Sequence, residues 1–463
     1  MYALSLLLLG DSQTVYWNIG CGTDLKPTCI LYPKTVEEVS HIVKLLNQNN
    51  ETFAVKSGGH SPNKRFASID GGPLIALQEM TQLNYDNATQ TIAVGPGNRW
   101  QHVVQATGKY GRSVVSGRLG HVGVPGLLLG GGLSFLSAER GWASTHVVEY
   151  QLVLPNGTIT TASRTHNPDL HRALQSGGGQ FGIVTRFTLN TFEQGPVWGG
   201  VRFYNGDKTP QLLAAVRDFT EYYPDPRAGL ILTAETTLYG YADLWVMFYF
   251  WNGASPPAHV FENFTKLPPM IDTVKTQSYT DLVYANNAFV LNGSYYSIAT
   301  ETLPLPDAKN GVEVMTAVHN HWKNTSAQVS DKIFGSVASV AYQPMPKLIS
   351  QQTKKYGGNV MDMGEDGHRI ILEYDYSYIN GFAENERIGD KANRELYSGV
   401  RSIIQKFMND GKLPNISTPL FMNDAYHAQD FWGRFKERDF MKSVKAKIDP
   451  GDFFGKRTHG WKL

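Results

Sequence analysis

The chain of 463 residues carries 42 Lys and Arg against 41 Asp and Glu, a formal net charge of +1 at neutral pH. This balance argues against a nucleic-acid backbone as the main partner, because such partners call for a basic surface. The length predicts two domains. The only cysteines, Cys21 and Cys29, cannot form a four-ligand metal site, so we expect no metal and either a local disulfide or two free buried thiols.

Two features of the sequence concern the cellular location of the protein: an apolar stretch near the start of the chain and a set of glycosylation sequons. The apolar stretch of Leu4 and Leu6 to Leu9 is too short to span a bilayer and lacks the basic flank and cleavage site of a complete signal peptide, so no membrane partner is expected. Asn-x-Ser/Thr sequons favour the secretory route, while a cytoplasmic location stays open because so short a pattern often occurs by chance. The sequons are at Asn50, Asn87, Asn156, Asn263, Asn292, Asn324 and Asn415.

The first 190 residues predict alternating helices and strands. Residues 35–46 have apolar residues at helical spacing, with Pro33 just ahead and acidic residues in the first turn. Residues 98–110 show the same period. Between them, short apolar runs bounded by Gly, Asn or Asp predict strands. These runs are 53–55, 74–76 and 91–94.

From about Gly195 the chain becomes rich in aromatic residues. Residues 244–251 and 369–376 predict sheet strands, and the second of these runs alternates in character. A second domain built on a sheet is therefore expected. Residues 439–450 predict a closing amphipathic helix stopped by Pro450, and the aromatic pair Phe453 and Phe454 is suited to docking.

Two glycine-rich segments are the strongest functional signal. The run 53–61 ends an apolar strand in Ser-Gly-Gly-His-Ser, and 117–134 holds a second glycine-rich block. Glycines let backbone N–H groups approach a pyrophosphate closely, and Ser57 and Ser61 add hydroxyl donors. Two such loops in one domain indicate a large phosphate-bearing ligand, and His60 is placed to meet it.

An ordered set of motifs carries a family resemblance over nearly the whole chain. It resembles the vanillyl-alcohol-oxidase type of FAD-linked oxidases, in the fungal form of the berberine-bridge-enzyme branch. The resemblance implies an α+β protein with a bipartite PCMH-type FAD-binding domain (1–192 and the return 412–463) and an inserted substrate domain (193–411) whose antiparallel sheet, with helices, covers the flavin. The motifs are Pro33, 55–61, 94–97, Gly117 and Arg118, 123–132, 149–157, 178–185 and Asp449 with Pro450.

The resemblance assigns flavin-binding residues one by one. His60 matches the histidine to which the family attaches FAD covalently, and Asn423 matches the asparagine of a late Asn-Tyr pair that holds the flavin. His121 is placed to touch the flavin or to pack as a structural histidine. The remaining matches are Lys56, Ser57, Gly58, Gly59 and Ser61 in the pyrophosphate loop, Gly117, Gly120, Val122, Gly123 and Gly126 along the flavin ring, and Gly182, Ile183 and Val184 near the ribityl chain.

Three positions in the second glycine loop decide how the flavin is attached and oxidised. Leu119 stands where many relatives carry a cysteine that forms a second covalent link, so a single link and a smaller, more enclosed substrate are expected. Val122 matches a position that admits or blocks oxygen, and valine is the oxidase-like choice. Pro125 stands where glycine is usual, so the backbone at this position departs from the residue pattern of the family.

Oxidation of the substrate requires a residue that takes a proton. At the position where a tyrosine is usual in the family, directly after Asn423, this chain has Asp424. Relatives place a tyrosine or a carboxylate in this pair or on the substrate sheet. The candidates here are Tyr426, Asp424 and His368, and structural hydrogen bonding is the alternative role of each.

These residues predict an FAD-dependent oxidase that takes a hydride from an alcohol, an amine or an activated C–H carbon of a small secondary-metabolite-type substrate. Electrons then pass to O2 to give H2O2. Two alternatives stay open: a flavoprotein cyclase that catalyses a net non-redox pericyclic ring closure, and a carbohydrate oxidase.

Overall fold

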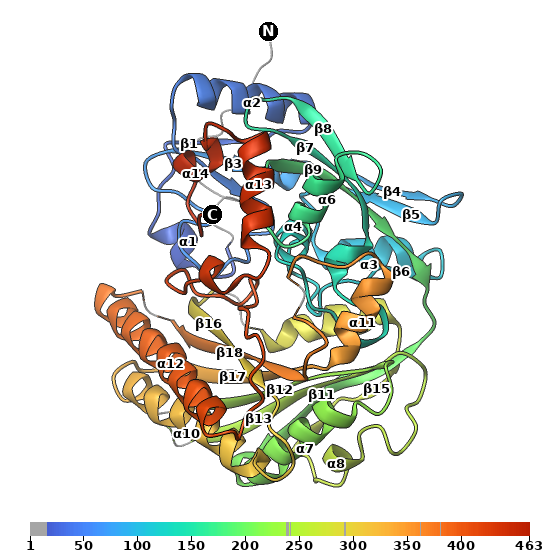
Figure 1. Cartoon of the computed structure of the whole chain (residues 1–463), viewed down its shortest axis with the longest axis vertical. Helices are drawn as coiled ribbons and strands as arrows, with labels where there is room; N and C mark the ends of the chain where they lie inside the picture. Colours follow the sequence, from blue (N-terminus) through green and yellow to red (C-terminus); the bar gives the residue numbers. More distant parts are fainter. Residues whose placement is uncertain (1–15, 238–239, 241, 291–292, 362, 380) are drawn as a thin grey trace.

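The structure is a computed structural model that describes residues 16–237, 240, 242–290, 293–361, 363–379 and 381–463. The apolar stretch from Leu4 to Leu9 and the sequon at Asn292 lie outside these residues. The described chain forms two lobes, and its C-terminal segment returns to the N-terminal lobe (Figure 1). This arrangement confirms the predicted α+β class.

The N-terminal lobe begins with a small parallel sheet of strand order β1-β3-β2. Helix α2 (Val36–Gln48) is the predicted amphipathic helix, and the Thr35 side chain caps it by accepting a hydrogen bond from the Glu38 N–H. The run Ser57 to Ser61 follows directly after β2, so the strand fixes where the loop starts. The strands are β1 (Cys29–Leu31), β2 (Ala54–Lys56) and β3 (Pro73–Ala76).

A five-stranded antiparallel sheet of order β4-β5-β9-β7-β8 completes this lobe. The second predicted helix is α3 (Trp100–Gly108), and the second glycine-rich block contains α4 (Val124–Leu129). Gly182 directly precedes β9. The strands are β4 (Leu83–Asp86), β5 (Thr91–Val94), β7 (Val147–Val153), β8 (Ile159–Ser163) and β9 (Ile183–Asn190).

The second lobe is built on one antiparallel sheet of order β14-β11-β13-β12-β17-β18-β16, with β15 paired to β11. Three long helices cover the face turned away from the N-terminal lobe: α7 (Thr209–Tyr222), α10 (Gly311–Ser330) and α12 (Ala383–Asn409) (Figure 1). The strands are β11 (Val197–Asn205), β12 (Ala228–Thr237), β13 (Ala242–Trp251), β14 (Ile271–Asp272), β15 (Lys275–Gln277), β16 (Tyr295–Pro304), β17 (Val337–Met345) and β18 (Arg369–Tyr378).

Alternation along β18 shows how this sheet serves both sides. The side chains of Ile370, Leu372, Tyr374 and Tyr376 belong to the apolar core shared with the helices. Because successive side chains of a strand point to opposite faces, the odd-numbered residues of β18 face the N-terminal lobe.

The C-terminal return docks as the sequence predicts. Helices α13 (Arg438–Ile448) and α14 (Phe453–Arg457) lie against the N-terminal lobe (Figure 1). The ring of Phe453 lies 5.4 Å from that of Phe53, and both belong to one apolar core. The Asp449 carboxylate accepts hydrogen bonds from the N–H groups of Phe453 (2.7 Å) and Phe454 (3.0 Å), which fixes the turn between the helices.

The domain boundaries at 192/193 and 411/412 stay a prediction.

The remaining short elements connect these layers. The short elements include α1 (Gly20–Thr23), β6 (Arg112–Ser113), α5 (Ser137–Arg140), α6 (Pro168–Leu174), β10 (Phe192–Glu193), α8 (Glu262–Thr265), α9 (Tyr279–Ala285) and α11 (Lys347–Lys355).

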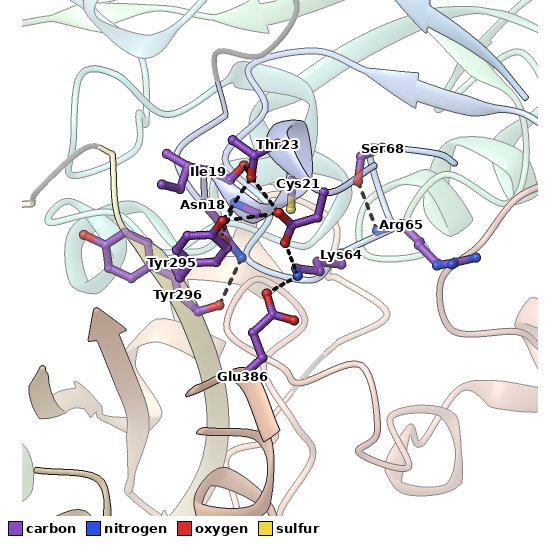
Figure 2. A network of polar contacts seen from close by, with 12 residues as sticks. Asn18, Ile19, Cys21, Thr23, Lys64, Arg65, Ser68, Tyr295, Tyr296 and Glu386 are labelled. Carbon is purple, nitrogen blue, oxygen red and sulfur yellow. Dashed lines mark hydrogen bonds and ion pairs between the residues drawn. The ribbon is translucent and has the colours of Figure 1, made fainter. Parts of the chain in front are cut away.

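A polar network joins the two lobes beside the His60 loop (Figure 2). The Lys64 ammonium group bonds to the Asp24 carboxylate at 2.6 Å and to the Glu386 carboxylate of α12. The Asn18 side-chain amide donates to the Tyr296 carbonyl of β16 at 3.0 Å. The segment that carries His60 is therefore tied to the sheet of the second lobe.

Both cysteines are free thiols in the structure, and Cys21 is buried near this network. Its thiol donates to the Ser61 carbonyl at 3.7 Å. Burial raises the pKa of the Cys21 thiol to about 12, so the group is neutral and packs as a small apolar side chain.

Candidate functional site

A cavity of about 750 Å³ lies between the lobes. The glycine-rich segments of the N-terminal lobe line one side, and the sheet of the second lobe lines the other. Residues from the C-terminal return complete the lining, including Asn423, Asp424 and Trp461. Three segments that are far apart in the sequence therefore enclose one space, which is large enough for a sizeable ligand.

His60 stands in the first loop between aromatic rings. Its imidazole stacks on Trp17 with ring centroids 4.5 Å apart and lies 4.8 Å from the ring of His121. Burial lowers its pKa well below the ordinary value, and the charges of His121 and Arg99 lower it further. The imidazole is therefore neutral at physiological pH, and its buried Nε2 has no hydrogen-bond partner.

The two glycine loops touch each other through their backbones. A Cβ on Gly58 would come within 2.5 Å of the Cα of Gly123, so only glycine allows this approach. Arg99 holds the pair together, because its guanidinium donates to the carbonyl of Gly58 at 3.0 Å and to that of His121. Arg99 was not singled out from the sequence, where a basic residue before a helix is typical of a solvent-exposed position.

Most of the predicted flavin residues line the cavity, and four do not. Lys56 instead places its ammonium group over the Tyr16 ring, 4.9 Å from the centroid. His121 lies behind His60, where its Nδ1 contacts the Asn287 side-chain oxygen at 2.7 Å. Gly117 and Gly120 also lie outside the lining. The residues that line the cavity are Ser57, Gly58, Gly59, His60, Ser61, Val122, Gly123, Gly126, Gly182, Ile183, Val184 and Asn423.

Asn423 connects the C-terminal return to the second loop. Its side-chain amide donates to the Gly126 carbonyl at 2.9 Å, and its side-chain oxygen accepts from the Gly132 N–H at 3.2 Å. Leu119 and Pro125, at two of the positions that differ from the family pattern, also line the cavity.

The N-terminal side of the cavity has the features that an FAD molecule requires. Close-packed glycine backbones form a cradle that a Cβ would fill, and a neutral histidine in the cavity wall has a buried nitrogen without a hydrogen-bond partner. The N-terminal loops, the start of β9 and the C-terminal return would hold the dinucleotide. In the described part of the chain, no cluster of three or more His, Cys, Asp or Glu side chains could hold a metal ion.

The sheet side of the cavity presents carboxyl groups that the sequence had not revealed. Glu235 of β12 and Glu373 and Asp375 of β18 all line it. The two β18 residues share a face because they are two positions apart. The alternation of residues 369–376 predicts that Glu373 and Asp375 share one face of the sheet. The place of Glu235 beside them cannot be predicted without knowing which strands are paired.

Asp424 faces this acidic side. Its carboxylate accepts a hydrogen bond from the Gln343 amide at 2.9 Å. Burial raises its pKa to about 6, against the opposing effects of Arg118 and of the Gln343 bond. Burial also raises the pKa of Glu373 well above its usual range, and the charge of Asp424 adds to that rise. The two carboxyls and Arg118 therefore form one coupled group.

Two of the three proposed proton acceptors do not line the cavity in the described structure. The Tyr426 hydroxyl donates to Asp390 of α12, and its ring packs in the core on the helix side of the sheet. His368 directly precedes β18, and its carbonyl accepts from the Leu305 N–H at 2.9 Å. His368 is two positions before Ile370, whose side chain faces the helices. The alternation of side chains along the strand therefore points the His368 side chain away from the cavity.

Comparisons with known proteins agree with this geometry. A family model described as an FAD binding domain matches residues 27–163. An uncharacterized FAD-linked oxidoreductase of Arthroderma benhamiae is 40% identical over 452 residues, which cover 97% of this chain and 89% of that protein. In the described residues, no helix is both long and apolar enough to cross a membrane.

Solved structures share the fold. The structure of 6-hydroxy-D-nicotine oxidase from Arthrobacter nicotinovorans matches with a TM-score of 0.77 at 19% identity, covering 98% of this chain and 97% of that one. A berberine bridge enzyme variant described as a reticuline dehydrogenase matches with a TM-score of 0.77 at 16% identity, covering 98% of this chain and 95% of that one. The chain therefore belongs to the FAD-linked oxidoreductases, and it shares its fold with berberine bridge enzyme.

Proposed function

We propose that this FAD-dependent oxidoreductase is an oxidase for a small secondary-metabolite-type substrate. The observation that carries the proposal is the opposition, across one cavity, of a neutral His60 loop and a face of carboxyl groups. Bound FAD supplies the acceptor for a hydride from a C–H bond of the substrate. The chain supplies the proton acceptor and the shape of the site.

His60 is proposed as the single covalent anchor of the flavin. Its neutral imidazole and partnerless Nε2 support this role, since an attacking nitrogen needs a free lone pair. The stacked Trp17 ring restricts its orientation. Leu119 in the cavity lining cannot form a second link.

Asp424 is proposed to take the proton released as the substrate is oxidised. Among the three candidates from the sequence, it alone lines the cavity. A pKa of about 6 leaves the carboxylate mostly ionised at neutral pH and still basic enough to accept a proton. Arg118 limits how far burial raises that pKa, and the Gln343 bond fixes the orientation of the carboxylate.

Molecular oxygen is the proposed electron acceptor. Val122 lines the cavity at the position that controls oxygen access in this branch. The substrate loses a hydride and a proton, and O2 takes two electrons and two protons to give H2O2. Neither the cyclase nor the carbohydrate oxidase is favoured by a specific observation in the structure.

The protein is proposed to enter the secretory pathway. The described sequon asparagines are all exposed, as glycosylation requires: Asn50, Asn87, Asn156, Asn263, Asn324 and Asn415. A mobility shift of protein from a fungal secretory host after glycosidase treatment would support this location, whereas an unglycosylated protein from that host would contradict it.

The oxidase is tested with purified protein and a panel of alcohols, amines and polyketide-like compounds. The flavin absorbance is followed after anaerobic addition of each compound and again after oxygen is readmitted. Bleaching by a substrate, followed by recovery of the colour with release of H2O2, is the expected result. Product formation without bleaching of the flavin would contradict the oxidase proposal and would support a cyclase instead.

A further inference from the structure

One row of side chains crosses three neighbouring strands on the cavity face of the sheet. Glu235 of β12 pairs with Ser339 of β17, and Ser339 pairs with Asp375 of β18. All three line the cavity. At a strand spacing of about 4.8 Å, the Cα atoms of the two acids lie about 10 Å apart with a small serine between them.

The two acids of this row are buried carboxyl groups whose charged forms are disfavoured. Burial raises the pKa of Glu235 to about 7. Burial raises the pKa of Asp375 well above its usual range, and the charge of Glu235 adds to the rise. Among the described residues, no cation lowers the pKa of either acid. Arg118, by contrast, acts on Asp424 and Glu373.

The Asp375 carboxyl is also incompletely satisfied. Its Oδ1 is enclosed by protein and accepts no hydrogen bond from any described residue. A buried carboxylate in this state is costly unless a proton or a cation from elsewhere compensates it. All three side chains line the cavity, so a ligand there is positioned to supply the compensating charge.

We propose that Glu235, Ser339 and Asp375 form a niche that binds the protonated amino group of the substrate. An ammonium group has three donors, which match two carboxylates and one hydroxyl. Ser339 leaves room between the acids for this group. The inference rests on the proposed oxidase and narrows its substrate class to amines.

The surroundings of the niche define the rest of the substrate. The cavity face next to the row is apolar and includes aromatic side chains, so it suits a hydrophobic or aromatic body attached to the amine. The residues that form this face are Ile231, Val246, Phe248, Phe289, Ile298 and Val337.

The niche also predicts a dependence on pH. The titratable and charged groups that face it are Tyr296 of β16, Glu373 of β18 and, beyond Glu373, Asp424 and Arg118. Burial and the two acids hold the Tyr296 hydroxyl in its neutral form. Because both acids of the niche have raised pKa values, their binding of an ammonium group strengthens as the pH rises from 6 to 8.

The experiment compares the binding of phenethylamine with that of 2-phenylethanol to the flavin-loaded enzyme. The two probes have the same aromatic body and differ in charge. Anaerobic titrations follow the flavin absorbance and calorimetric heat in wild type and in the double variant Glu235→Gln/Asp375→Asn. The exposed acid Glu51→Gln is the matched control.

Wild type and Glu51→Gln are expected to bind the amine about tenfold more tightly than the alcohol, and the double variant should bind both equally. Ser339→Ala should lose a smaller part of the preference. Equal binding of both probes by wild type, or a preference retained in the double variant, would overturn the niche.

Wild type alone provides a second test if the double variant does not fold. Its affinity for phenethylamine should rise between pH 6 and pH 8, while that for 2-phenylethanol should not change. A flat or falling amine affinity would overturn the niche. Failure of the oxidase itself is separate, because it would appear as a flavin that no substrate bleaches while the probes still bind.

Discussion

The two sides of the cavity differ in how they are made. The N-terminal side consists of loops in which neighbouring residues act together, and it presents backbone groups and a neutral histidine. The sheet side consists of side chains drawn from six strands, and it presents carboxyl groups. The first side suits FAD, which is the same molecule in every FAD-dependent enzyme. The second side suits the substrate, which differs from one such enzyme to another.

The difference also appears in their tolerance of change. The loops depend on the contact between Gly58 and Gly123, which leaves no room for a side chain. The sheet face keeps its backbone pairing whichever side chains point into the cavity. Substitutions on the sheet should therefore alter chemistry and specificity, whereas substitutions in the loops should remove the cofactor or destabilise the fold.

The largest effect is expected from His60→Ala. Removing the imidazole removes the proposed nucleophile, so no flavin should stay with the protein after acid precipitation. Wild-type pellets should be yellow and fluorescent. His41→Ala, at an exposed histidine on α2, is the control and should keep the flavin. A yellow pellet from His60→Ala would place the link elsewhere.

The next largest effect is expected from Asp424→Asn. Loss of the proton acceptor should slow anaerobic flavin reduction by a good substrate about 10²–10⁴-fold. In wild type the rate should rise as the pH passes through about 6, because the carboxylate must be ionised to accept a proton. Stopped-flow absorbance measures both. Asp439→Asn, at an exposed acid on α13, should behave as wild type, and an unchanged rate and pH profile in Asp424→Asn would exclude this role.

Glu235→Gln should change stability in a pH-dependent way. The Glu235 pKa rises on folding from 4.5 to about 7, so its contribution to stability is present below pH 4.5 and is lost as the pH rises through 7. Glutamine does not titrate. The variant should therefore gain up to about 3 kcal/mol relative to wild type between pH 4.5 and pH 8. Thermal unfolding at the two pH values measures the gain, and a constant difference would contradict burial of this charge.

Gly58→Ala should destabilise the contact between the loops by about 1–3 kcal/mol, since the new methyl group would overlap the backbone of Gly123. Flavin content should fall as well. Gly451→Ala provides the control, because a Cβ there meets nothing within 4 Å. Thermal unfolding and flavin absorbance test the pair, and equal behaviour of the two variants would show that the loops can separate at little cost.

Lys64→Met should have the smallest effect. Its ion pairs with Asp24 and Glu386 join the lobes, but the three side chains are about one third exposed, and such pairs contribute at most about 1 kcal/mol. Lys406→Met, which removes the ion pair between Lys406 of α12 and Asp410 just after that helix, is the matched control. A larger loss of stability or of flavin in Lys64→Met would mean that the lobes depend on this network (Figure 2).

The sequence predicted the loops better than the sheet face for a physical reason. His60 and its glycines are adjacent in the chain, so their pattern is local. The row of Glu235, Ser339 and Asp375 exists only through strand pairing across more than a hundred residues. Periodicity predicted the strands at 244–251 and 369–376 but not which strands are neighbours. Tyr426 and His368 are candidates from sequence because of their residue types, whereas packing and strand alternation decide where their side chains point.

The most direct measurement is a tryptic mass map of the purified wild-type protein. Cleavage after Lys56 and Lys64 releases the peptide 57–64, which contains His60 as its only histidine. The account predicts that this peptide carries the mass and the fluorescence of FAD. An unmodified 57–64 peptide, with FAD on another peptide or released on denaturation, would contradict the assignment of His60 as the flavin anchor.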